Sequence, residues 1–589
     1  MGAAGGGAFL LGDTSPEGVF TPEDFTEEHR MIAEMTEQFV EQEVRPHDDR
    51  LEAQDFTLLV GLLRKAGELG LLGADVPEEY GGSGLDKVAS TLLTEKLVKA
   101  GSFALSHGAH TGIGSLPIVL FGTEEQKRRY VPDLVSGRKL AAYCLTEPSS
   151  GSDALGARTT AVLDEAGTHY TLNGTKQFIT NAGFADLFIV YAKIDGKQFS
   201  AFIVEREYEG VSTGPEEKKM GIKGSSTRAL ILDNVRVPAE NLLGEPGRGH
   251  VIAFNILNIG RYKLAAGCVG SSKWALQLAV EYARNRRQFG RPIADFPLLR
   301  QKMADVYARI YAAESMVYRT AGLIEGALSG LSGADAADAK QVARAIEEYA
   351  LECSINKVYA SECLDFAADE GVQIHGGYGY IQEYPIERIY RDSRINRIFE
   401  GTNEINRLLI PDTLLKRAMK GRLPLLETLE RLQSELTEPR PEPDGTPLSE
   451  EGIMLQAGKR LFLLAGGTAV SRIPPDRLEQ HQEVLASLAD MAIAIYAAES
   501  AWLRSRKAAG RGDREEGVRL DAARLIVADT LETLEQKAKT VLAATLEGDA
   551  LRVQLGIVRR LARFEPLNRV EVRRRIAARV VEEGGYVGS

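Results

Sequence analysis

Cysteine and tryptophan are scarce in this chain of 589 residues, which holds four cysteines and two tryptophans. Cys144, Cys268, Cys353 and Cys363 are scattered without C-x-x-C spacing, and the eight histidines are equally dispersed. The sequence therefore offers neither a disulfide framework nor a zinc motif, and it is typical of reduced thiols in a cytosol. We expect a cytoplasmic protein without a metal site.

Long apolar runs and a positive net charge are also missing. No uninterrupted apolar stretch approaches the roughly 20 residues that a membrane-spanning helix needs. The N-terminus lacks the cationic start and long apolar core of a signal peptide, so residues 1–24 are expected to form a flexible tail. The net charge of −12 argues against nucleic acid as the main partner, because a polyanion would be repelled overall.

The texture of the chain changes several times along its length. Apolar residues at three- and four-residue spacing predict a helical domain over residues 25–140. Residues 141–245 are rich in Thr, Val, Ile, Phe and Tyr and predict a β domain, in which Asn173-Gly174 favours a hairpin turn between two strands. Helical periodicity returns over residues 246–420.

A second helical region follows a stretch dense in proline and charge. Residues 421–448 predict a linker, and residues 449–589 predict a helical extension. The expected fold class is α+β, mainly α, with an N-terminal helical bundle, a central β domain, a second helical bundle and a C-terminal all-α extension.

The most informative segment is Ile398-Phe-Glu-Gly-Thr402, where Glu400 stands before a predicted helix. Thr402 is a natural N-cap, and the apolar residues that follow it fit a helical stripe. Burial would raise the pKa of a carboxylate placed there, while the helix N-terminus would lower it, so the group can be tuned as a base. The alternative is a solvated residue at a helix end.

Three further segments carry groups suited to a ligand. The loop after Tyr143 is rich in hydroxyls and contains Gly151, which allows close backbone approach, although a plain surface turn has the same composition. Phe178 and Thr180 alternate along a predicted strand, where Phe178 belongs either to the core or to a stacking site. The glycine-rich segment Gly371–Tyr380 offers N–H groups that could hold a pyrophosphate.

Taken together, six motifs in this order resemble the acyl-CoA dehydrogenases. The resemblance covers about residues 25–415, and the C-terminal extension is similar to the very-long-chain branch. The motifs are Tyr143-Cys-Leu-Thr-Glu-Pro-Ser-Ser-Gly-Ser-Asp153, Phe178-Ile-Thr180, Met220-Gly-Ile-Lys223, Arg286-Arg-Gln-Phe-Gly290, Gln373-Ile-His-Gly-Gly377 and Ile398-Phe-Glu-Gly-Thr402.

The resemblance implies the acyl-CoA dehydrogenase fold with noncovalent FAD. Phe178 stands where the family more often has Trp, which keeps ring stacking but weakens it. The residues implied to bind FAD are Tyr143, Leu145, Thr146, Gly151, Ser152, Phe178, Ile179, Thr180, Arg286, Phe289, Gln373, Gly377, Thr402 and Glu404.

The resemblance also implies a substrate and a catalytic base. Glu400 matches the family's base, and the alternative position of the base in some branches is here Gly260, which cannot act as one. The implied reaction is α,β-dehydrogenation of an acyl-CoA to a trans-2-enoyl-CoA, the first step of fatty acid β-oxidation. The residues implied to contact acyl-CoA are Ser152, Asn258, Arg261, Phe399 and Gly401.

The partner and the acyl chain length stay as alternatives. Electron-transferring flavoprotein is the expected electron acceptor, and the rival functions are an oxidase that uses dioxygen and a non-catalytic assembly factor. Residues 104–114 border the acyl pocket in the family that the chain resembles, and the small residues there either leave room for long acyl chains or serve ordinary helix packing. The resemblance to the long-chain branch, in which the extension occupies the surface that shorter members use to form tetramers, implies a homodimer. Its nine arginines from Arg552 to Arg579 either contact anionic lipid, which would make the protein peripheral to a membrane, or pair with the protein's own acidic surface.

Overall fold

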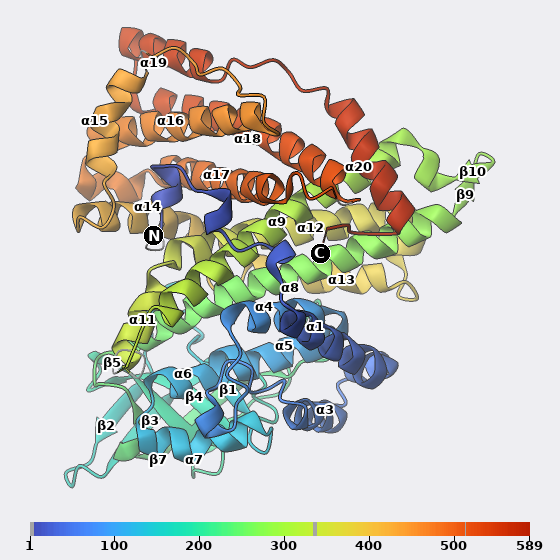
Figure 1. Cartoon of the computed structure of the whole chain (residues 1–589). Helices are drawn as coiled ribbons and strands as arrows, with labels where there is room; N and C mark the ends of the chain where they lie inside the picture. Colours follow the sequence, from blue (N-terminus) through green and yellow to red (C-terminus); the bar gives the residue numbers. More distant parts are fainter. Residues whose placement is uncertain (1–4, 334–337, 437, 513, 589) are drawn as a thin grey trace. The chain divides into compact units, whose positions relative to one another are not determined.

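The computed structural model describes residues 5–333, 338–436, 438–512 and 514–588 (Figure 1). The chain divides into two compact units. The β-domain unit comprises residues 26–263 and 327–347, and the helical unit comprises residues 1–25, 264–326 and 348–589. The division falls within two long helices, α8 (Gly249–Asn285) and α9 (Pro297–Ser329).

Short helices form the first part of the β-domain unit. Several begin at a side chain that caps the free N–H groups of the first turn, as Thr26 does for α1 and Asp86 for α4. The apolar faces of the first five helices bury one core that includes Phe39, Leu63 and Phe103. The helices are α1 (Glu27–Phe39), α2 (Asp48–Glu52), α3 (Phe56–Glu68), α4 (Lys87–Lys96), α5 (Ser102–Gly108), α6 (Leu116–Phe121), α7 (Glu124–Val135) and α11 (Ala339–Glu347).

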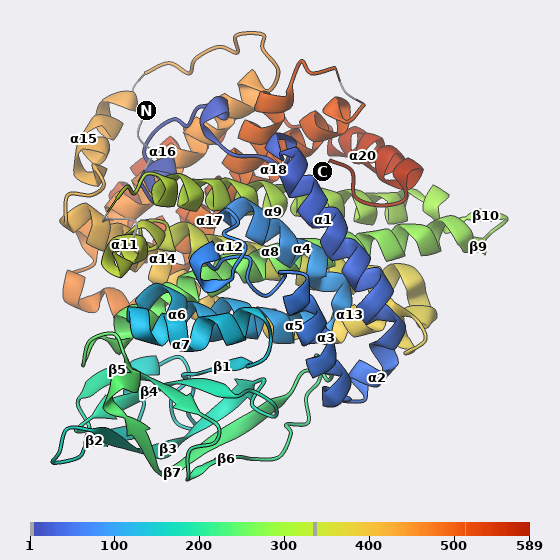
Figure 2. The same cartoon turned by 60° about the horizontal axis from the view of Figure 1, so that its bottom comes forward.

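A mixed sheet follows these helices, as the β-rich composition predicts. Its strands lie in the order β6-β7-β3-β2-β4-β5-β8, and β1 pairs in parallel with β4 (Figure 2). Inward side chains such as Phe188, Val190 and Leu230 form its core. The strands are β1 (Ala141–Cys144), β2 (Thr160–Leu163), β3 (His169–Thr180), β4 (Leu187–Ile194), β5 (Gln198–Glu205), β6 (Val211–Thr213), β7 (Thr227–Pro238) and β8 (Leu242–Leu243).

The predicted hairpin at Asn173-Gly174 is wrong, because β3 runs unbroken through both residues. The pairing of β3 with β7 shifts register between Leu172 and Gly174, which is a β-bulge. Glycine is required there, since a Cβ on Gly174 would lie 2.4 Å from Oγ1 of Thr159. The side chain of Asn173 accepts a hydrogen bond from the backbone N–H of Asn234 at 2.8 Å, so it bridges two strands instead of making a turn.

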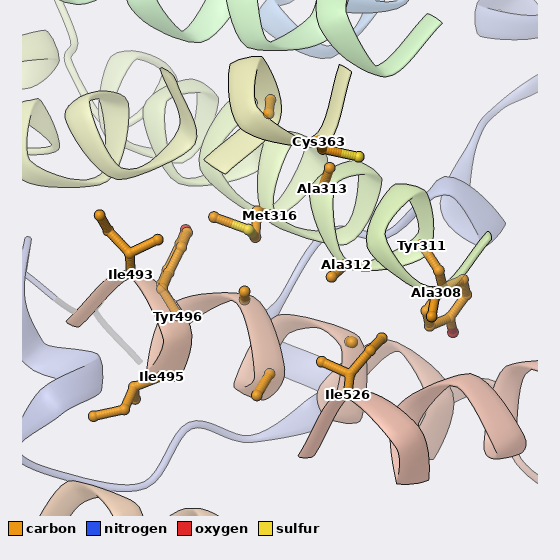
Figure 3. Packing of buried hydrophobic residues seen from close by; sticks show 14 of the residues in the cluster. Ala308, Tyr311, Ala312, Ala313, Met316, Cys363, Ile493, Ile495, Tyr496 and Ile526 are labelled. Carbon is orange, nitrogen blue, oxygen red and sulfur yellow. The ribbon is translucent and has the colours of Figure 1, made fainter. Parts of the chain in front are cut away.

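The helical unit buries one large core that joins the second bundle to the extension. Figure 3 shows Met316 of α9, Tyr496 of α17 and Ile526 of α18 in this cluster. Beyond α8 and α9, the unit contains the short strands β9 (Arg287–Gln288) and β10 (Arg291–Pro292), and helices α12 (Ala350–His375), α13 (Pro385–Ser393), α14 (Asn403–Met419), α15 (Leu425–Glu435), α16 (Ser449–Arg472), α17 (Gln482–Ala508), α18 (Glu516–Thr545), α19 (Gly548–Leu561) and α20 (Arg569–Glu583).

Helix α17 is as long and as apolar as a membrane-spanning helix. It passes the length and composition test, with a mean hydropathy of 1.4 over its most apolar stretch. However, 78% of that stretch is buried inside the protein, and α17 also carries the buried Arg504 and Glu499. Its apolar residues are therefore those of a core helix.

The expected flexible tail is also wrong for the residues that the structure describes from Gly5 onward. Phe9 and Leu10 lie in the core of the helical unit, 4% and 0% exposed. The backbone N–H of Gly7 donates to the carboxylate of Glu352 at 2.7 Å. Burial of apolar side chains and a buried hydrogen bond hold this segment, and glycine-rich composition gave no sign of either.

The predicted linker contains a helix, and several arginines of the predicted helical extension form ion pairs within their own unit. Helix α15 lies inside the range 421–448, and the described residues 438–448 after it form no helix or strand. In the extension, Arg569, Arg573, Arg575 and Arg579 all form ion pairs with carboxylates of the same unit. For these four arginines, the structure agrees with the prediction that basic residues of the extension pair with the protein's own acidic groups.

Candidate active site

The segment from Phe399 to Thr402 forms a tight turn that opens helix α14. Glu400 has φ of 58° and Gly401 has φ of 80°, so a non-glycine residue occupies the left-handed region. Such a conformation costs about 1–3 kcal/mol and persists only where surrounding contacts hold it. Thr402 caps α14 as predicted, since its hydroxyl accepts a hydrogen bond from the backbone N–H of Ile405 at 3.2 Å.

A buried lysine holds this turn from α12. Lys357 is fully buried, and its ammonium donates to the carbonyl of Gly401 at 2.8 Å and to Oδ1 of Asn403 at 2.7 Å. Asn406 also donates to the carbonyl of Gly401, at 2.8 Å. Hydrogen bonds to a charged donor are worth about 1.5–3 kcal/mol, which is enough to offset the strain at Glu400. Sequence reasoning missed Lys357.

Two neighbours of the turn were also predicted as site residues. Phe399 is half-buried, and Glu404 is exposed in the first turn of α14. A hydrogen bond from its own backbone N–H lowers the pKa of Glu404, and the hydroxyl of Thr402 adds to this effect. Glu404 is therefore an anionic hydrogen-bond acceptor at the surface of the helical unit.

The hydroxyl-rich loop after β1, in the β-domain unit, is also held by a buried lysine. Lys176, fully buried on β3, donates to Glu147 at 2.7 Å. Glu147 also accepts from the backbone N–H groups of Arg158 and Thr159, at 2.6 and 3.0 Å. Burial lowers the pKa of Lys176, although the hydrogen bond to Glu147 opposes this shift. The ion pair thus pins the loop to the sheet.

The loop lies beside the end of β3, where Phe178 stands. The backbone N–H of Gln177 donates to the carbonyl of Thr146 at 2.9 Å. Phe178 has φ of 58° and is 62% exposed, so it is not a core residue. Gly151 and Ser152 are exposed in the loop. An exposed ring, an exposed hydroxyl and an open glycine are groups that suit a flat, polar-edged ligand such as a flavin.

Several predicted residues of this unit have buried or half-buried side chains. Leu145 is 8% exposed and Ile179 is 2% exposed, and Ile179 packs in the sheet core. Tyr143 is half-buried, with its ring 5.3 Å from that of Tyr191. Thr180 is half-buried at the end of β3. The side chains of Leu145 and Ile179 are therefore part of the protein interior, whereas those of Tyr143 and Thr180 reach the surface in part.

Asn258 and Arg261 lie one turn apart on α8 in the same unit. The guanidinium of Arg261 donates to Oδ1 of Asn258 at 3.1 Å, and the two residues are 7% and 5% exposed. A paired polar side chain in a buried setting is fixed in orientation, which suits recognition of a polar substrate group. Their i, i+3 spacing brings them together as the helical prediction requires.

The remaining predicted residues belong to the helical unit. Phe289 lies in the turn between β9 and β10 and is 92% exposed, and Figure 1 shows this hairpin projecting beyond α8 and α9. The guanidinium of Arg286 lies 5.6 Å from the ring of Tyr378. Gln373 is exposed, and a Cβ added to Gly377 would meet nothing within 4 Å. A cation, an amide and an open glycine suit a phosphate group.

The predicted residues therefore form two sets, one in each unit. Ring stacking and hydroxyl groups gather around Phe178, while the carboxylate of Glu400 and the cationic groups around Arg286 belong to the helical unit. In the part of the chain that the structure describes, no group of three His, Cys, Asp or Glu side chains could hold a metal ion. Within the helical unit, the carboxylate of Glu400 is the group placed for acid–base chemistry, at the turn that opens α14.

Sequence comparison decides the family. The chain matches the acyl-CoA dehydrogenase N-terminal domain over residues 26–138, the middle domain over 142–235 and the C-terminal domain over 247–415. A second acyl-CoA dehydrogenase C-terminal domain matches residues 457–560, within the extension. This chain belongs to the acyl-CoA dehydrogenase family.

Individual relatives agree with this assignment to the acyl-CoA dehydrogenases. A probable acyl-CoA dehydrogenase of Bacillus subtilis is 57% identical over 99% of this chain and 98% of its own length. The very long-chain specific acyl-CoA dehydrogenase of Macaca fascicularis is 40% identical over 78% of this chain and 67% of its own. A crystal structure of an acyl-CoA dehydrogenase complexed with FAD from Bacillus anthracis is 56% identical, with a TM-score of 0.98 over 100% of both chains.

Proposed function

We propose that this acyl-CoA dehydrogenase oxidises the Cα–Cβ bond of long-chain acyl-CoA thioesters to trans-2-enoyl-CoA, the first step of fatty acid β-oxidation. The observation that carries the proposal is the strained, lysine-held turn that presents Glu400 at the start of α14. In this proposal Glu400 removes the α-proton of the substrate. FAD, when bound, supplies the acceptor for the hydride that leaves the β-carbon.

The residues of the chain supply orientation and acid–base chemistry. The backbone N–H of Glu400 would donate to the thioester carbonyl, which acidifies the α-proton. Ser152, Asn258, Arg261, Phe399 and Gly401 would contact the acyl-CoA. The residues that would hold FAD are Tyr143, Leu145, Thr146, Gly151, Ser152, Phe178, Ile179, Thr180, Arg286, Phe289, Gln373, Gly377, Thr402 and Glu404. Among them, the exposed ring suits a flavin ring, the hydroxyls suit its polar edge, and the cationic group suits the pyrophosphate.

A preference for long acyl chains has support from α5 and the π-helical turn after it. A Cβ added at Gly108 or at Gly112 would meet nothing within 4 Å, so this face leaves room beside the helix. The similarity to very long-chain specific relatives agrees with it. We propose electron-transferring flavoprotein as the acceptor of the electrons. Production of peroxide in air with acyl-CoA alone would instead identify dioxygen as the acceptor and the protein as an oxidase.

The remaining parts of the proposal concern assembly and location. We assign a homodimer in the cytoplasm, since the extension implies a dimer in the branch that this chain resembles. Arg559, Arg560 and Arg563, at the end of α19 and just after it, keep the extension basic. Their peripheral contact with anionic membranes would be supported by co-sedimentation with phosphatidylglycerol vesicles that is lost in salt.

The test is bleaching of the visible flavin absorbance in the FAD-loaded protein after rapid mixing with acyl-CoA. The wild type should be bleached fastest by long chains in a series from about four to about twenty carbons, which span the family's range. Glu400→Gln should keep its FAD but be bleached on the order of 10²–10⁴ times more slowly. Brisk bleaching of this variant would refute the base, and a stable protein complex with negligible turnover would indicate an assembly factor.

A further inference from the structure

Helix α17 of the extension contacts α14 through a carboxylate. Asp490 on α17 accepts a hydrogen bond from Nε of Arg407 at 2.7 Å. Lys537 on α18 donates to the other oxygen of Asp490 at 2.6 Å. Arg407 lies in the second turn of α14, the helix that begins directly after the turn carrying Glu400. All of these residues belong to the helical unit.

The contact continues from Arg407 toward the turn. Both terminal nitrogens of Arg407 donate to the carboxylate of Glu362 on α12, at 2.8 and 3.1 Å. Glu362 also accepts from the side-chain amide of Asn403 at 3.1 Å. Asn403 in turn accepts from Lys357, which donates to the carbonyl of Gly401. An unbroken series of charge-assisted hydrogen bonds therefore joins the extension to the residue after Glu400.

The inner end of this series is well protected from solvent. Asn403 is 2% exposed and Lys357 is fully buried, whereas the side chain of Asp490 is 22% exposed. In a buried setting a hydrogen bond is stronger than in water, and its partners orient one another. The guanidinium of Arg407 is planar and engaged on two sides, so it fixes the direction as well as the distance between α12, α14 and α17.

We propose that the C-terminal extension positions the active site, because Asp490 orients Arg407 and, through Glu362 and Asn403, fixes the turn that carries Glu400. Asp490 and Arg407 are positioning residues in this scheme. The inference rests on the proposed function, in which Glu400 is the base. It assigns the extension a part in the chemical step, in addition to any part in assembly.

The size of the expected effect follows from the sensitivity of proton transfer to geometry. A displacement of about 1 Å at a reacting group can cost about a hundredfold in rate. Removal of Asp490 leaves Arg407 bound to Glu362 alone, so the turn should loosen without unfolding. We therefore expect an intermediate loss, with the maximal rate reduced by about tenfold and the KM for acyl-CoA changed by less than about twofold.

Asp490→Ala is the test variant, and Asp305→Ala is its matched control. Asp305 on α9 accepts from Nε of Arg573 on α20 at 2.6 Å, so it also joins the second bundle to the extension. No hydrogen bond described above connects it to the turn. Each variant removes one carboxylate that pairs with an arginine across the same two parts of the helical unit. Comparable stability losses are expected for the two.

The first readout is the rate of flavin bleaching in the FAD-loaded full-length protein. Asp490→Ala should be about tenfold slower at saturating acyl-CoA, whereas Asp305→Ala should match the wild type. The second readout is hydrogen–deuterium exchange of the backbone amides over residues 400–406. Exchange there should increase in Asp490→Ala only. If Asp490→Ala does not fold, Asp490→Asn keeps the side-chain volume, and the same directions are expected.

Three results would overturn the inference. These are wild-type bleaching by the folded Asp490 variant, equal losses in the Asp490 and Asp305 variants, and unchanged exchange over residues 400–406. A failure of the proposed function is a different result, since then the FAD-loaded wild type itself would not be bleached by any acyl-CoA. The exchange measurement would still decide whether Asp490 orders the turn.

Discussion

Two loops that carry predicted site residues are each held by a fully buried lysine, but in different ways. Lys176 pins the hydroxyl-rich loop through a carboxylate, Glu147, and every contact of that pair described here lies within the β-domain unit. Lys357 holds the turn after Glu400 through a carbonyl and a side-chain amide. Further hydrogen bonds join that turn to Asp490 of the extension.

The difference indicates a division of tasks between the loops. A buried ion pair inside one unit makes a rigid platform, and the ring of Phe178 stands beside it. A turn with a strained φ, held by several long-range contacts, places one carboxylate accurately. The first lysine should therefore govern stability and cofactor retention, and the second should govern the rate of the chemical step.

The largest loss of stability is expected for Lys176→Met. This change leaves the carboxylate of Glu147 buried, 5% exposed, without its cation. Breaking a buried ion pair by removal of one partner costs about 3–5 kcal/mol. Urea unfolding should show this loss, and the purified variant should retain less FAD.

The matched control is Lys197→Met, at an exposed lysine between β4 and β5 of the same sheet. It should change the free energy of unfolding by less than about 0.5 kcal/mol. The double variant Lys176→Met with Glu147→Gln should recover part of the loss, because the buried charge is gone. Equal stability of the Lys176 and Lys197 variants would contradict the role of the ion pair.

A smaller loss of stability and a larger loss of rate are expected for Lys357→Met. The carbonyl of Gly401 keeps its hydrogen bond from Asn406, so the loss should be about 1–3 kcal/mol. Flavin bleaching should slow, while FAD content stays near that of the wild type. A variant that loses FAD as readily as Lys176→Met, yet reacts normally once loaded, would remove the distinction between the two loops.

The smallest effect is a difference in acid sensitivity. Burial alone would raise the pKa of Glu147, but the Arg158 N–H and the Lys176 ammonium outweigh it and hold that pKa below its ordinary 4.5. The stabilisation by Glu147 is therefore fully present above about pH 4.5 and is lost as the pH falls through the folded-state pKa. Unfolding measured from about pH 6 to about pH 3 should show a shallower decline in Glu147→Gln than in the wild type. Identical slopes would argue against this assignment.

Local features were the ones that the sequence predicted well. The N-cap at Thr402 depends on a residue three positions away, and the succession of helical, β and helical regions depends on periodicity alone. The family, its FAD dependence and the fold class are confirmed by the comparisons. The individual site residues, including Glu400, stay predictions.

Features that depend on distant contacts could not be predicted. Lys176 and Glu147 are 29 positions apart, Lys357 and Gly401 are 44 apart, and Arg407 and Asp490 are 83 apart. Phe178 lies at a register shift of β3 against β7, between Lys176 and Ile179. Asn173-Gly174 lies at another shift in the same strand pair, so its conformation is also set by contact with β7. One signal was available, since Lys176 falls on the inward face of a strand pattern, where an unpaired charge would be costly.

The central claim is that Glu400 takes the α-proton. The most direct measurement uses an acyl-CoA with deuterium at the α-carbon and no hydrogen at the β-carbon, so that only the proton step can occur. Mass spectrometry of this compound after incubation with FAD-loaded protein should show loss of deuterium to water with the wild type and none with Glu400→Gln. Equal loss with both proteins would contradict the account.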